Sequence, residues 1–394
     1  MTLLLAANAS LVEFVAGRGL PLPPLHVVDV GVSGGLNSAW RKWGNRLAAV
    51  GIDAIEDEIE RLTKLEENPS VRYVASRAVA PRGAPLTTPP DSNYALHRSL
   101  AYLAAQTLSR PNRETTERDF FRLWRDTVSG RMSPPPIEAN YSNIDDPVSD
   151  PFYGYYARHF AGSGKPRVAD RMATVDELLV STRLPRVDVL KVDTDGWDFD
   201  VLRGSEKALQ TCLAVEIEVQ FHGPVSDMSN VFCNIDSFLR RKGFSLFKLA
   251  PVTYARSALP KPFLYDIPAQ NESGQVMWAD ALYVRTALPT GDIDGRRNLA
   301  LVLDLYGLED ATAEILLETP GLFDGQQDRQ LLDFLARKVH GHGVTYRELV
   351  ESFLANPVHF ARPRPTPADL PTAEVKEPDR TPSAKRGWRR FLPW

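Results

Sequence analysis

Apolar residues along this chain gather into short runs, and several of the runs end at an acidic residue. One run leads to Asp29, a second covers 47–52 and ends at Asp53, and a third covers 187–192 and ends at Asp193. Short apolar runs bounded by turn residues are typical of strands buried in a parallel sheet. Helix-like patterns lie between the first runs. The pattern therefore predicts an α/β fold with a Rossmann-like, doubly wound sheet.

The same rhythm divides the chain into parts. We expect the sheet domain to occupy 25–285, interrupted by an insertion at about 98–168 where the rhythm breaks. Residues 1–24 are predicted to form an N-terminal helix that ends at a proline cluster, and 286–356 a helical appendage. The Pro-rich tail, 357–394, has few hydrophobic residues, a composition typical of disorder.

The helical appendage shows amphipathic patterns between residues 297 and 355. Its last predicted helix opens at Thr345-x-x-Glu348, the spacing of a capping box, in which the two side chains bind each other's backbone N–H groups. We expect this part to serve as a dimer surface or as a cap on the core, so a homodimer is one hypothesis.

The insertion carries a tyrosine-rich segment at residues 150–160. Its side chains of chemical interest are Tyr153, Tyr155, Tyr156 and His159. Aromatic faces and phenolic hydroxyls suit sugar rings, which combine apolar patches with many hydroxyls. One hypothesis is therefore that the segment shapes an acceptor pocket, because long insertions are often binding loops. The alternative is a surface subdomain or an oligomer contact.

The stretch from Val187 to Leu209 is the most informative, because an apolar strand runs there into Asp193, Asp195 and Gly196 before a helical pattern. Strands of this kind deliver polar side chains to the carboxyl edge of a parallel sheet, where α/β folds bind ligands. If the strand stays extended, both carboxylates project to the same side. The alternative is a solvated turn in which an Asp caps the helix.

A glycine-rich turn follows the first strand, as Asp29-Val-Gly31-Val-Ser-Gly34-Gly35, and we expect a helix from there to about residue 47. Glycines let the backbone pass close under a ligand, and a helix N-terminus offers free N–H groups. Asp53, at the end of the second strand, suits the two hydroxyls of a ribose. Asp29 stands where a dinucleotide motif has its first glycine, so the turn favours an adenosyl ligand without a pyrophosphate.

These residues resemble the FkbM-type S-adenosylmethionine-dependent methyltransferases. The resemblance rests on Leu190 to Gly204, preceded by Thr174-Val-Asp-Glu-Leu-Leu179, and it extends over about 25–285 apart from the insertion. Further matches are the strand entering the glycine turn, Ala78-Val-Ala80 with Gly83, and the runs 214–221 and 279–285. Asp195 replaces the commoner Glu of the family pattern, and Trp197 a commoner small residue.

The resemblance implies that S-adenosylmethionine is the cofactor and that Gly31, Gly34 and Asp53 hold it, with Asp29 beside them. An adenine contact is expected near residues 76–78. Asp193 and Asp195 would lie beside the methyl donor, where one of them orients the acceptor hydroxyl or acts as base. The expected reaction is O-methylation of a sugar, a glycan precursor or a related metabolite, and polyketide hydroxyls are within the family's range.

Two further candidates follow the run at 214–221. Glu216 and Glu218 share one face of that strand, and His222, in the loop after it, is a candidate general base because a neutral imidazole can accept a proton near pH 7. The alternative for His222 is a structural turn residue. The acidic side chains at these strand ends could instead hold Mg²⁺, which takes oxygen ligands, although we expect no resident metal. Lys191 is predicted to pack along the edge of its strand.

Composition and charge limit the partners and the cellular compartment that we expect for this chain. A formal net charge of −4 gives no electrostatic reason to expect nucleic acid as a partner. The two cysteines lack metal-site spacing, which favours a reducing, cytoplasmic compartment. No run approaches the roughly 18 apolar residues of a spanning helix. The tail ends in basic and aromatic residues, 385–394, which could touch the inner membrane face or a partner protein, or remain solvated.

Two other interpretations of the sequence compete with a methyltransferase. A nicotinamide-dependent oxidoreductase is disfavoured by Asp29 in the first glycine position and by the absence of a Tyr-x-x-x-Lys pair after the fourth strand. A non-catalytic scaffold that keeps the fold would use its appendage and tail for assembly, and the departures at Asp195 and Trp197 keep that hypothesis open.

Overall fold

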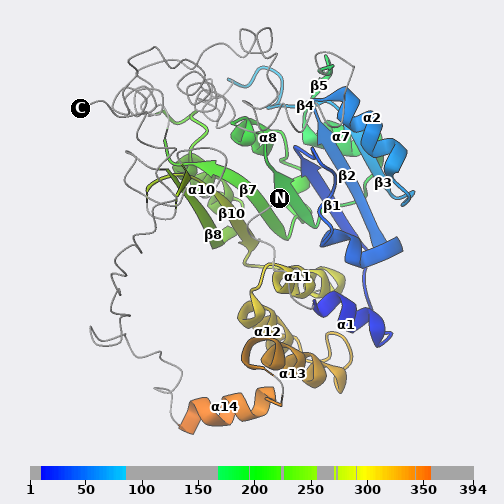
Figure 1. Cartoon of the computed structure of the whole chain (residues 1–394), viewed down its shortest axis with the longest axis vertical. Coiled ribbons are helices and arrows are strands. Elements are labelled where there is room, and N and C mark those ends of the chain that lie inside the picture. Colours follow the sequence, from blue (N-terminus) through cyan, green and yellow to red (C-terminus); the bar gives the residue numbers. More distant parts are fainter. Residues whose placement is uncertain are drawn as a thin grey trace, which may run out of the picture.

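A computed structural model of the chain describes residues 10–85, 167–194, 196–222, 226–254, 270–271, 274–289, 291–341 and 343–355. Its centre is an eight-stranded sheet (Figure 1). The strands are β1 (Leu25–Val30), β2 (Leu47–Asp53), β3 (Val71–Ala75), β6 (Val189–Val192), β7 (Ala214–Gln220), β8 (Phe244–Tyr254), β9 (Gln270–Asn271) and β10 (Gln275–Arg285). The short strands β4 (Arg77–Ala78) and β5 (Met172–Ala173) pair with each other beside it.

The strand order is β3-β2-β1-β6-β7-β10-β8-β9. The first five strands are parallel, while β10 is antiparallel to both β7 and β8. The sheet thus departs from the dinucleotide-binding order 3-2-1-4-5-6 by a late antiparallel strand inserted near its edge. The order reverses at β1, which lies between β2 and β6, and such a switch point is where open α/β sheets bind ligands. The prediction of a Rossmann-like α/β sheet is confirmed.

One face of the sheet is covered by helices from the middle of the chain. These are α7 (Val175–Thr182), α8 (Asp198–Arg203), α9 (Ala208–Thr211) and α10 (Phe232–Arg241). Their apolar side chains form one buried cluster with alternate strand residues such as Val28, Leu190 and Ile217. The alternation follows from the period of two along a strand, which sends neighbouring side chains to opposite faces.

The opposite face carries helices from both ends of the chain and α2 (Glu56–Leu65). The end helices are α1 (Leu11–Gly17), α11 (Ile293–Leu305), α12 (Glu309–Glu318) and α13 (Gln327–His340), followed by α14 (Tyr346–Ala355). Figure 1 shows α1 beside α11. The backbone N–H of Leu11 donates to Asp304 Oδ2 at 2.7 Å, and Asn298 Nδ2 donates to the Pro24 carbonyl at 2.8 Å. One hydrophobic core therefore joins these helices to the sheet.

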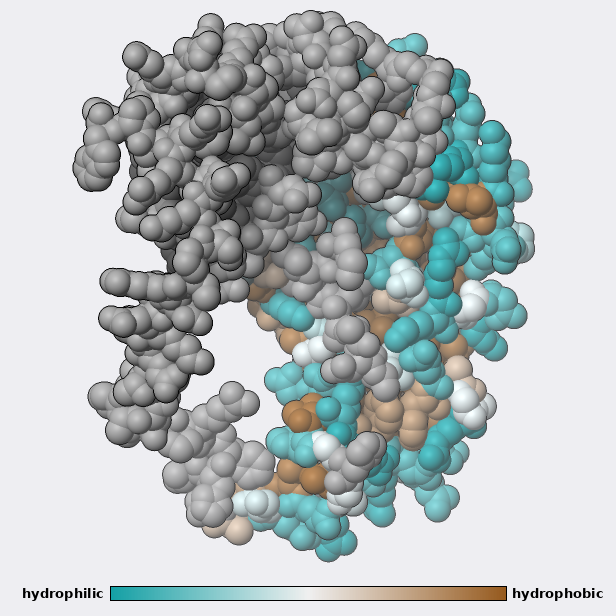
Figure 2. Space-filling view, in the orientation of Figure 1, coloured by the Kyte–Doolittle hydropathy of each residue, from teal (hydrophilic) through white to brown (hydrophobic). Residues whose placement is uncertain are grey.

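The C-terminal helices confirm the helical pattern predicted between residues 297 and 355. The capping box before α14 is present, because Thr345 N donates to Glu348 Oε2 at 2.9 Å and Glu348 N donates to Thr345 Oγ1 at 3.3 Å. Within the described ranges, no helix has the length and apolar character needed to cross a membrane. Hydrophilic side chains cover most of the described surface in the view of Figure 2.

The prediction of a helix that begins directly after the glycine turn is wrong. The chain instead forms turns and then a 3₁₀ helix, η1 (Trp40–Arg46), with a kink at Gly44 where φ is 55° and ψ is −126°. In a 3₁₀ helix, side chains three residues apart lie above one another. This spacing sends both Trp40 and Trp43 into the core. Burial of two indoles outweighs the local preference for a continuous α-helix.

Several predicted features lie outside the described residues. These are the tyrosine-rich segment with Tyr153, Tyr155, Tyr156 and His159, the tail at 357–394, and Asp195. The insertion's two described flanks lie close together, since Arg77 N donates to the Arg171 carbonyl at 2.9 Å. The first flank also contacts α8, because Arg203 Nη1 donates to the Pro85 carbonyl at 2.7 Å. Arg167 also pairs with Asp57 at 2.8 Å, just beyond the end of β2.

Candidate functional site

The candidate site lies at the carboxyl ends of β1, β2 and β6, and Gly31 is its tightest point. Gly31 has φ +86°, and a Cβ there would lie 1.8 Å from the carbonyl oxygen of Asp193. The Asp193 N–H donates to the Val30 carbonyl at 2.9 Å, and the Gly31 N–H to the Ile52 carbonyl at 2.8 Å. Only glycine fits this approach without strain. The turn is thereby fixed against the ends of both neighbouring strands.

The second half of the turn is held by a residue that the sequence analysis missed. Gly34 has φ +88°, and its N–H donates to Glu58 Oε1 at 2.9 Å. Glu58 is fully buried in the first turn of α2 and is paired with Arg61, whose Nη2 lies 2.6 Å from the same oxygen. The position of Glu58 in the acidic first turn of the helix that follows Asp53 was the available signal.

Asp53 ends β2 beside the glycine turn. Its Oδ2 accepts a hydrogen bond from Ser33 Oγ at 2.8 Å, and its Oδ1 accepts one from Ile55 N at 2.9 Å. Burial raises the pKa of this carboxyl, and the hydrogen bonds from Ile55 and Ser33 oppose that rise. The Ser76 N–H donates to the Asp53 carbonyl at 2.9 Å, which places the expected adenine region, 76–78, next to Asp53.

A row of charged side chains crosses the middle of the sheet. Asp29, Lys191 and Glu216 are aligned in register on β1, β6 and β7, so their side chains share one face. Lys191 Nζ lies 3.3 Å from Asp29 Oδ1 and 3.2 Å from Asp193 Oδ2. The prediction that Lys191 packs along a strand edge is wrong, because β6 is paired on both sides and the ammonium serves two carboxylates.

Burial and charge act in opposite directions on this row. Burial lowers the pKa of Lys191, but the carboxylates of Asp193, Asp29 and Glu216 outweigh it and hold that pKa well above its ordinary value. Burial raises the pKa of Asp29, although Lys191 opposes the rise. The side chain of Asp29 is 3% exposed and that of Asp193 is 44% exposed. Asp193 is therefore the member of the pair that an acceptor can reach.

The loop after Asp193 is shaped by Asp198, a second residue that the sequence analysis missed. Its carboxylate accepts hydrogen bonds from Thr194 N at 2.8 Å, Thr194 Oγ1 at 2.9 Å, Gly196 N at 3.0 Å and Asn230 Nδ2 at 3.2 Å. Asp198 is fully buried, and burial raises its pKa against these hydrogen bonds. The three acids spaced in Asp193-Thr-Asp-Gly-Trp-Asp198 were the signal for such a turn.

Glu218 and His222 lie further along the same edge. Glu218 is buried on the same face as Glu216 and is in register with Asp280 of β10. His222 is in the loop after β7, where its Nε2 lies 2.8 Å from the Val276 carbonyl. The same ring nitrogen lies 3.2 Å from Gln275 Nε2, so two groups at the start of β10 contact it. Within the described residues, no hydrogen bond joins His222 to Asp193.

The acidic residues suggested as a Mg²⁺ set have separate partners. Tyr306 Oη donates to Glu216 Oε2 at 2.6 Å, and Asp193 pairs with Lys191. In the part of the chain that the structure describes, no three His, Cys, Asp or Glu side chains gather as a metal site would require.

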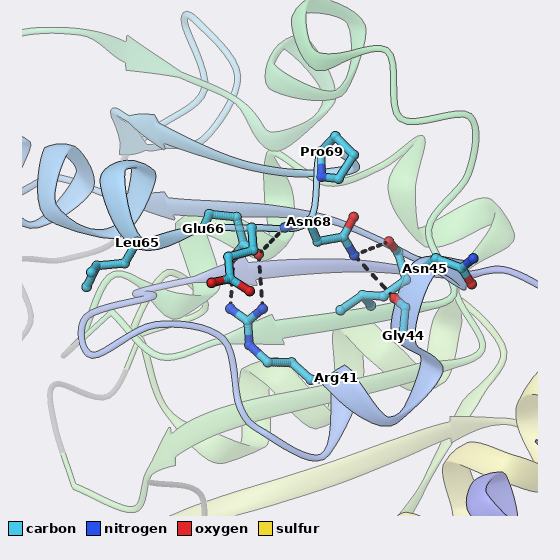
Figure 3. A pocket seen from close by; sticks show the side chains of 9 residues that line it. Arg41, Gly44, Asn45, Leu65, Glu66, Asn68 and Pro69 are labelled. Carbon is cyan, nitrogen blue, oxygen red and sulfur yellow. Dashed lines mark hydrogen bonds and ion pairs between the residues drawn. The ribbon is translucent and has the colours of Figure 1, made fainter.

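A surface pocket of about 430 Å³ lies at the other end of the sheet (Figure 3). It is formed where β2 begins and just before β3, and Arg41 and Glu66 form a bidentate pair in its wall at 2.9 and 3.1 Å. Asn68 Nδ2 donates to the carbonyls of Gly44 and Leu47 at 3.2 and 3.1 Å. These polar groups bind one another, and the pocket is remote from the strand ends that carry Asp53 and Asp193.

Comparison with known proteins places part of this architecture in a family. Residues 137–246 match the family described as the methyltransferase FkbM domain. The match is a little over a quarter of the chain and includes β6, α8, β7 and α10, with Lys191, Asp193 and Asp198. It is narrower than the resemblance at 25–285, since β1 to β3 lie before it. No curated protein matches the chain.

Solved structures of methyltransferases are similar over much of the chain at low identity. A TehB-like SAM-dependent methyltransferase from Corynebacterium glutamicum is 10% identical, with 71% of this chain and 89% of that chain covered and a TM-score of 0.25. A SAM-dependent methyltransferase from Aquifex aeolicus is 10% identical, with 70% and 90% covered and a TM-score of 0.26. The 23S rRNA methyltransferase ErmE is 13% identical, with 84% and 97% covered and a TM-score of 0.27.

The class of the protein rests on the family match, in agreement with the order of the sheet. The chain carries an FkbM methyltransferase domain at residues 137–246. This match supports a methyltransferase of the S-adenosylmethionine-dependent class.

Proposed function

We propose that this chain transfers a methyl group from S-adenosylmethionine to a hydroxyl of a sugar, a glycan precursor or a related metabolite. The observation that carries the proposal is the convergence of three features at one edge of the sheet: the Gly31 turn, Asp53 and Asp193. The 1.8 Å approach between a Cβ at Gly31 and the Asp193 carbonyl shows how closely the turn and the strand end meet.

The residues present fit the donor. An ionised carboxylate offers about four lone-pair sites. Ser33 Oγ and Ile55 N each engage one of them, on different oxygens, and the backbone N–H of Ser33 also bonds this carboxylate. This count leaves Asp53 a site for a ribose hydroxyl. The glycines at 31, 34 and 35 present no side chains to a ligand. The carboxylate of Asp29 is buried and pairs with Lys191. Asp29 therefore supports the site through this ion pair rather than through its own contact with the ligand.

When bound, S-adenosylmethionine supplies a methyl group on a positively charged sulfur. The chain's own task is to orient the acceptor and to disperse the proton of its hydroxyl. Asp193, half-exposed at the strand end, accepts the hydrogen bond of that hydroxyl. Lys191 holds Asp193 in place, because its ammonium lies 3.2 Å from the Asp193 carboxylate oxygen. Asp193 therefore acts mainly as the orienting group.

A neighbouring side chain then accepts the proton of the acceptor hydroxyl. His222 is the first candidate, since its half-buried imidazole lies in the loop after β7 and a neutral imidazole can accept a proton near pH 7. Glu218 and Asp195 are the other candidates for this role. A variant series at the three positions, followed as methyl transfer against pH, assigns the base to the position whose loss removes the rise of the rate between about pH 6 and 8.

The direct test of the donor is isothermal titration of the purified chain with S-adenosylmethionine, S-adenosylhomocysteine and NAD in parallel. Saturable binding of both adenosyl ligands and none of NAD supports the proposal and justifies a screen of sugar acceptors with labelled donor. Binding of NAD alone would support an oxidoreductase. Binding of none of the three would support a non-catalytic scaffold.

A further inference from the structure

Tyr306 reaches the charged row from outside the matched FkbM segment. It follows α11 and is fully buried, with its ring against Trp40 at a centroid distance of 5.9 Å. Its Oη donates to Glu216 Oε2 at 2.6 Å. This hydrogen bond joins residues 90 positions apart in the chain, one on a helix end and one in the centre of the sheet.

The row that Tyr306 joins is unbalanced in charge. Lys191 supplies one ammonium, while Asp29, Asp193 and Glu216 supply three carboxylates. Glu216 is aligned with Lys191 in the next strand, so it competes for the same cation. A hydroxyl donated to Glu216 reduces that competition and leaves Lys191 to Asp29 and Asp193, whose oxygens lie at 3.3 and 3.2 Å.

The helices hold Tyr306 firmly in place. Lys248 Nζ from β8 donates to the Tyr306 carbonyl at 2.8 Å. Two residues earlier, Asp304 is bound by Lys338 of α13 at 2.8 Å and by the backbone of Leu11 in α1 at 2.7 Å. Three elements thus fix the end of α11 from which Tyr306 extends to the sheet.

We propose that Tyr306 is a positioning residue of the methyltransferase site, and that the C-terminal helices are part of the catalytic unit. By satisfying Glu216, Tyr306 keeps Lys191 directed to Asp29 and Asp193, and so fixes the end of β6 beneath the glycine turn. The helices from α11 onward lie beyond the matched segment, and through Tyr306 they set the geometry of that edge. The link to catalysis rests on the proposed function.

The test compares Tyr306→Phe with Tyr283→Phe. Tyr283 is a matched control, because it is a buried sheet residue whose Oη donates to Asp236 at 3.3 Å from the opposite face. Amide hydrogen exchange of the ligand-free chain is read over residues 189–194. We expect Tyr306→Phe to speed exchange there about tenfold, the factor that corresponds to about 1.4 kcal/mol. Tyr283→Phe should leave these amides unchanged.

A second comparison tests the route through Glu216. In the background of Glu216→Gln, the charge that the hydroxyl satisfies is gone, so the effect of Tyr306→Phe should shrink to about twofold or less. The doubly substituted chain also carries the test if Tyr306→Phe alone does not fold. Equal acceleration by Tyr306→Phe and Tyr283→Phe, unchanged exchange at 189–194, or an effect that persists with Gln at position 216 would overturn the proposal.

Titration with S-adenosylhomocysteine separates this inference from the proposed function. We expect Tyr306→Phe to weaken binding about tenfold while Tyr283→Phe leaves it unchanged. Accelerated exchange in Tyr306→Phe together with normal binding would overturn the link to the site. If the unsubstituted chain binds no adenosyl ligand while the exchange pattern is as expected, the proposed function fails and the inference is overturned as a statement about catalysis. The packing role of Tyr306 would then remain.

Discussion

Replacement of Lys191 by Met is the most informative perturbation of the charged row. Met keeps the unbranched apolar stem but removes the ammonium that lies within 3.3 Å of both Asp29 and Asp193. Asp29 is 3% exposed, so water cannot replace the lost partner. Removing one member of a buried ion pair typically costs about 3–5 kcal/mol. This is a large part of the total stability of a domain, about 5–15 kcal/mol.

The stability lost in Lys191→Met should depend on pH. The shift in the pKa of Asp29 sets the direction of this dependence. Burial already raises that pKa above its ordinary value, and Lys191 opposes the rise, so Lys191→Met raises it further. A group with a raised pKa in the folded state binds more protons there than in the unfolded chain, so stability falls as pH rises. The loss caused by Lys191→Met should therefore be larger at pH 8 than at pH 5, because a lower pH favours the protonated form of Asp29.

Urea unfolding at both pH values measures this effect. The matched control is Lys242→Met, because Lys242 pairs with Glu206 at the surface and such pairs contribute less than about 1 kcal/mol. We expect a loss of about 3 kcal/mol or more at pH 8 for Lys191→Met and little change for the control. A loss below about 1 kcal/mol for Lys191→Met, or one that grows as the pH is lowered, would refute the reasoning.

Three further predictions concern the site itself. Asp53→Ala should weaken S-adenosylhomocysteine binding by about 1.5–3 kcal/mol through lost charge-assisted hydrogen bonds. An unchanged affinity in calorimetry would show that the ribose does not bind at Asp53. Asp193→Asn should reduce kcat for methyl transfer far more than it changes donor affinity, and full activity would remove Asp193 from the site. Asp198→Asn places an amide NH₂ against donors from Gly196 and Asn230. Its kcat should fall at least about tenfold with donor Kd within about twofold, and a parallel loss of both would indicate a general folding defect.

Much of the fold could be predicted from local pattern. The apolar runs before Asp29, Asp53 and Asp193 are the strands β1, β2 and β6, because buried parallel strands must be apolar on both faces. The capping box at Thr345 could be predicted because it depends only on residues three apart. Adjacent strand order then brings the three acids to one edge of the sheet.

The remaining features depend on contacts between distant residues. The 3₁₀ helix after the glycine turn forms because Trp40 and Trp43 reach a core built partly from C-terminal helices. The place of Lys191 depended on which strands flank β6, and local sequence does not carry that information. The bond between Tyr306 and Glu216 joins two segments with no shared pattern.

We propose that the methyl donor binds at the carboxyl ends of β1, β2 and β6. A crystal structure of the chain with S-adenosylhomocysteine tests it most directly. We predict the ribose hydroxyls on the carboxylate of Asp53, with the sulfur between the Gly31 turn and Asp193. A ligand bound instead in the pocket formed by Arg41 and Glu66, or at this edge without contact to Asp53, would contradict the account.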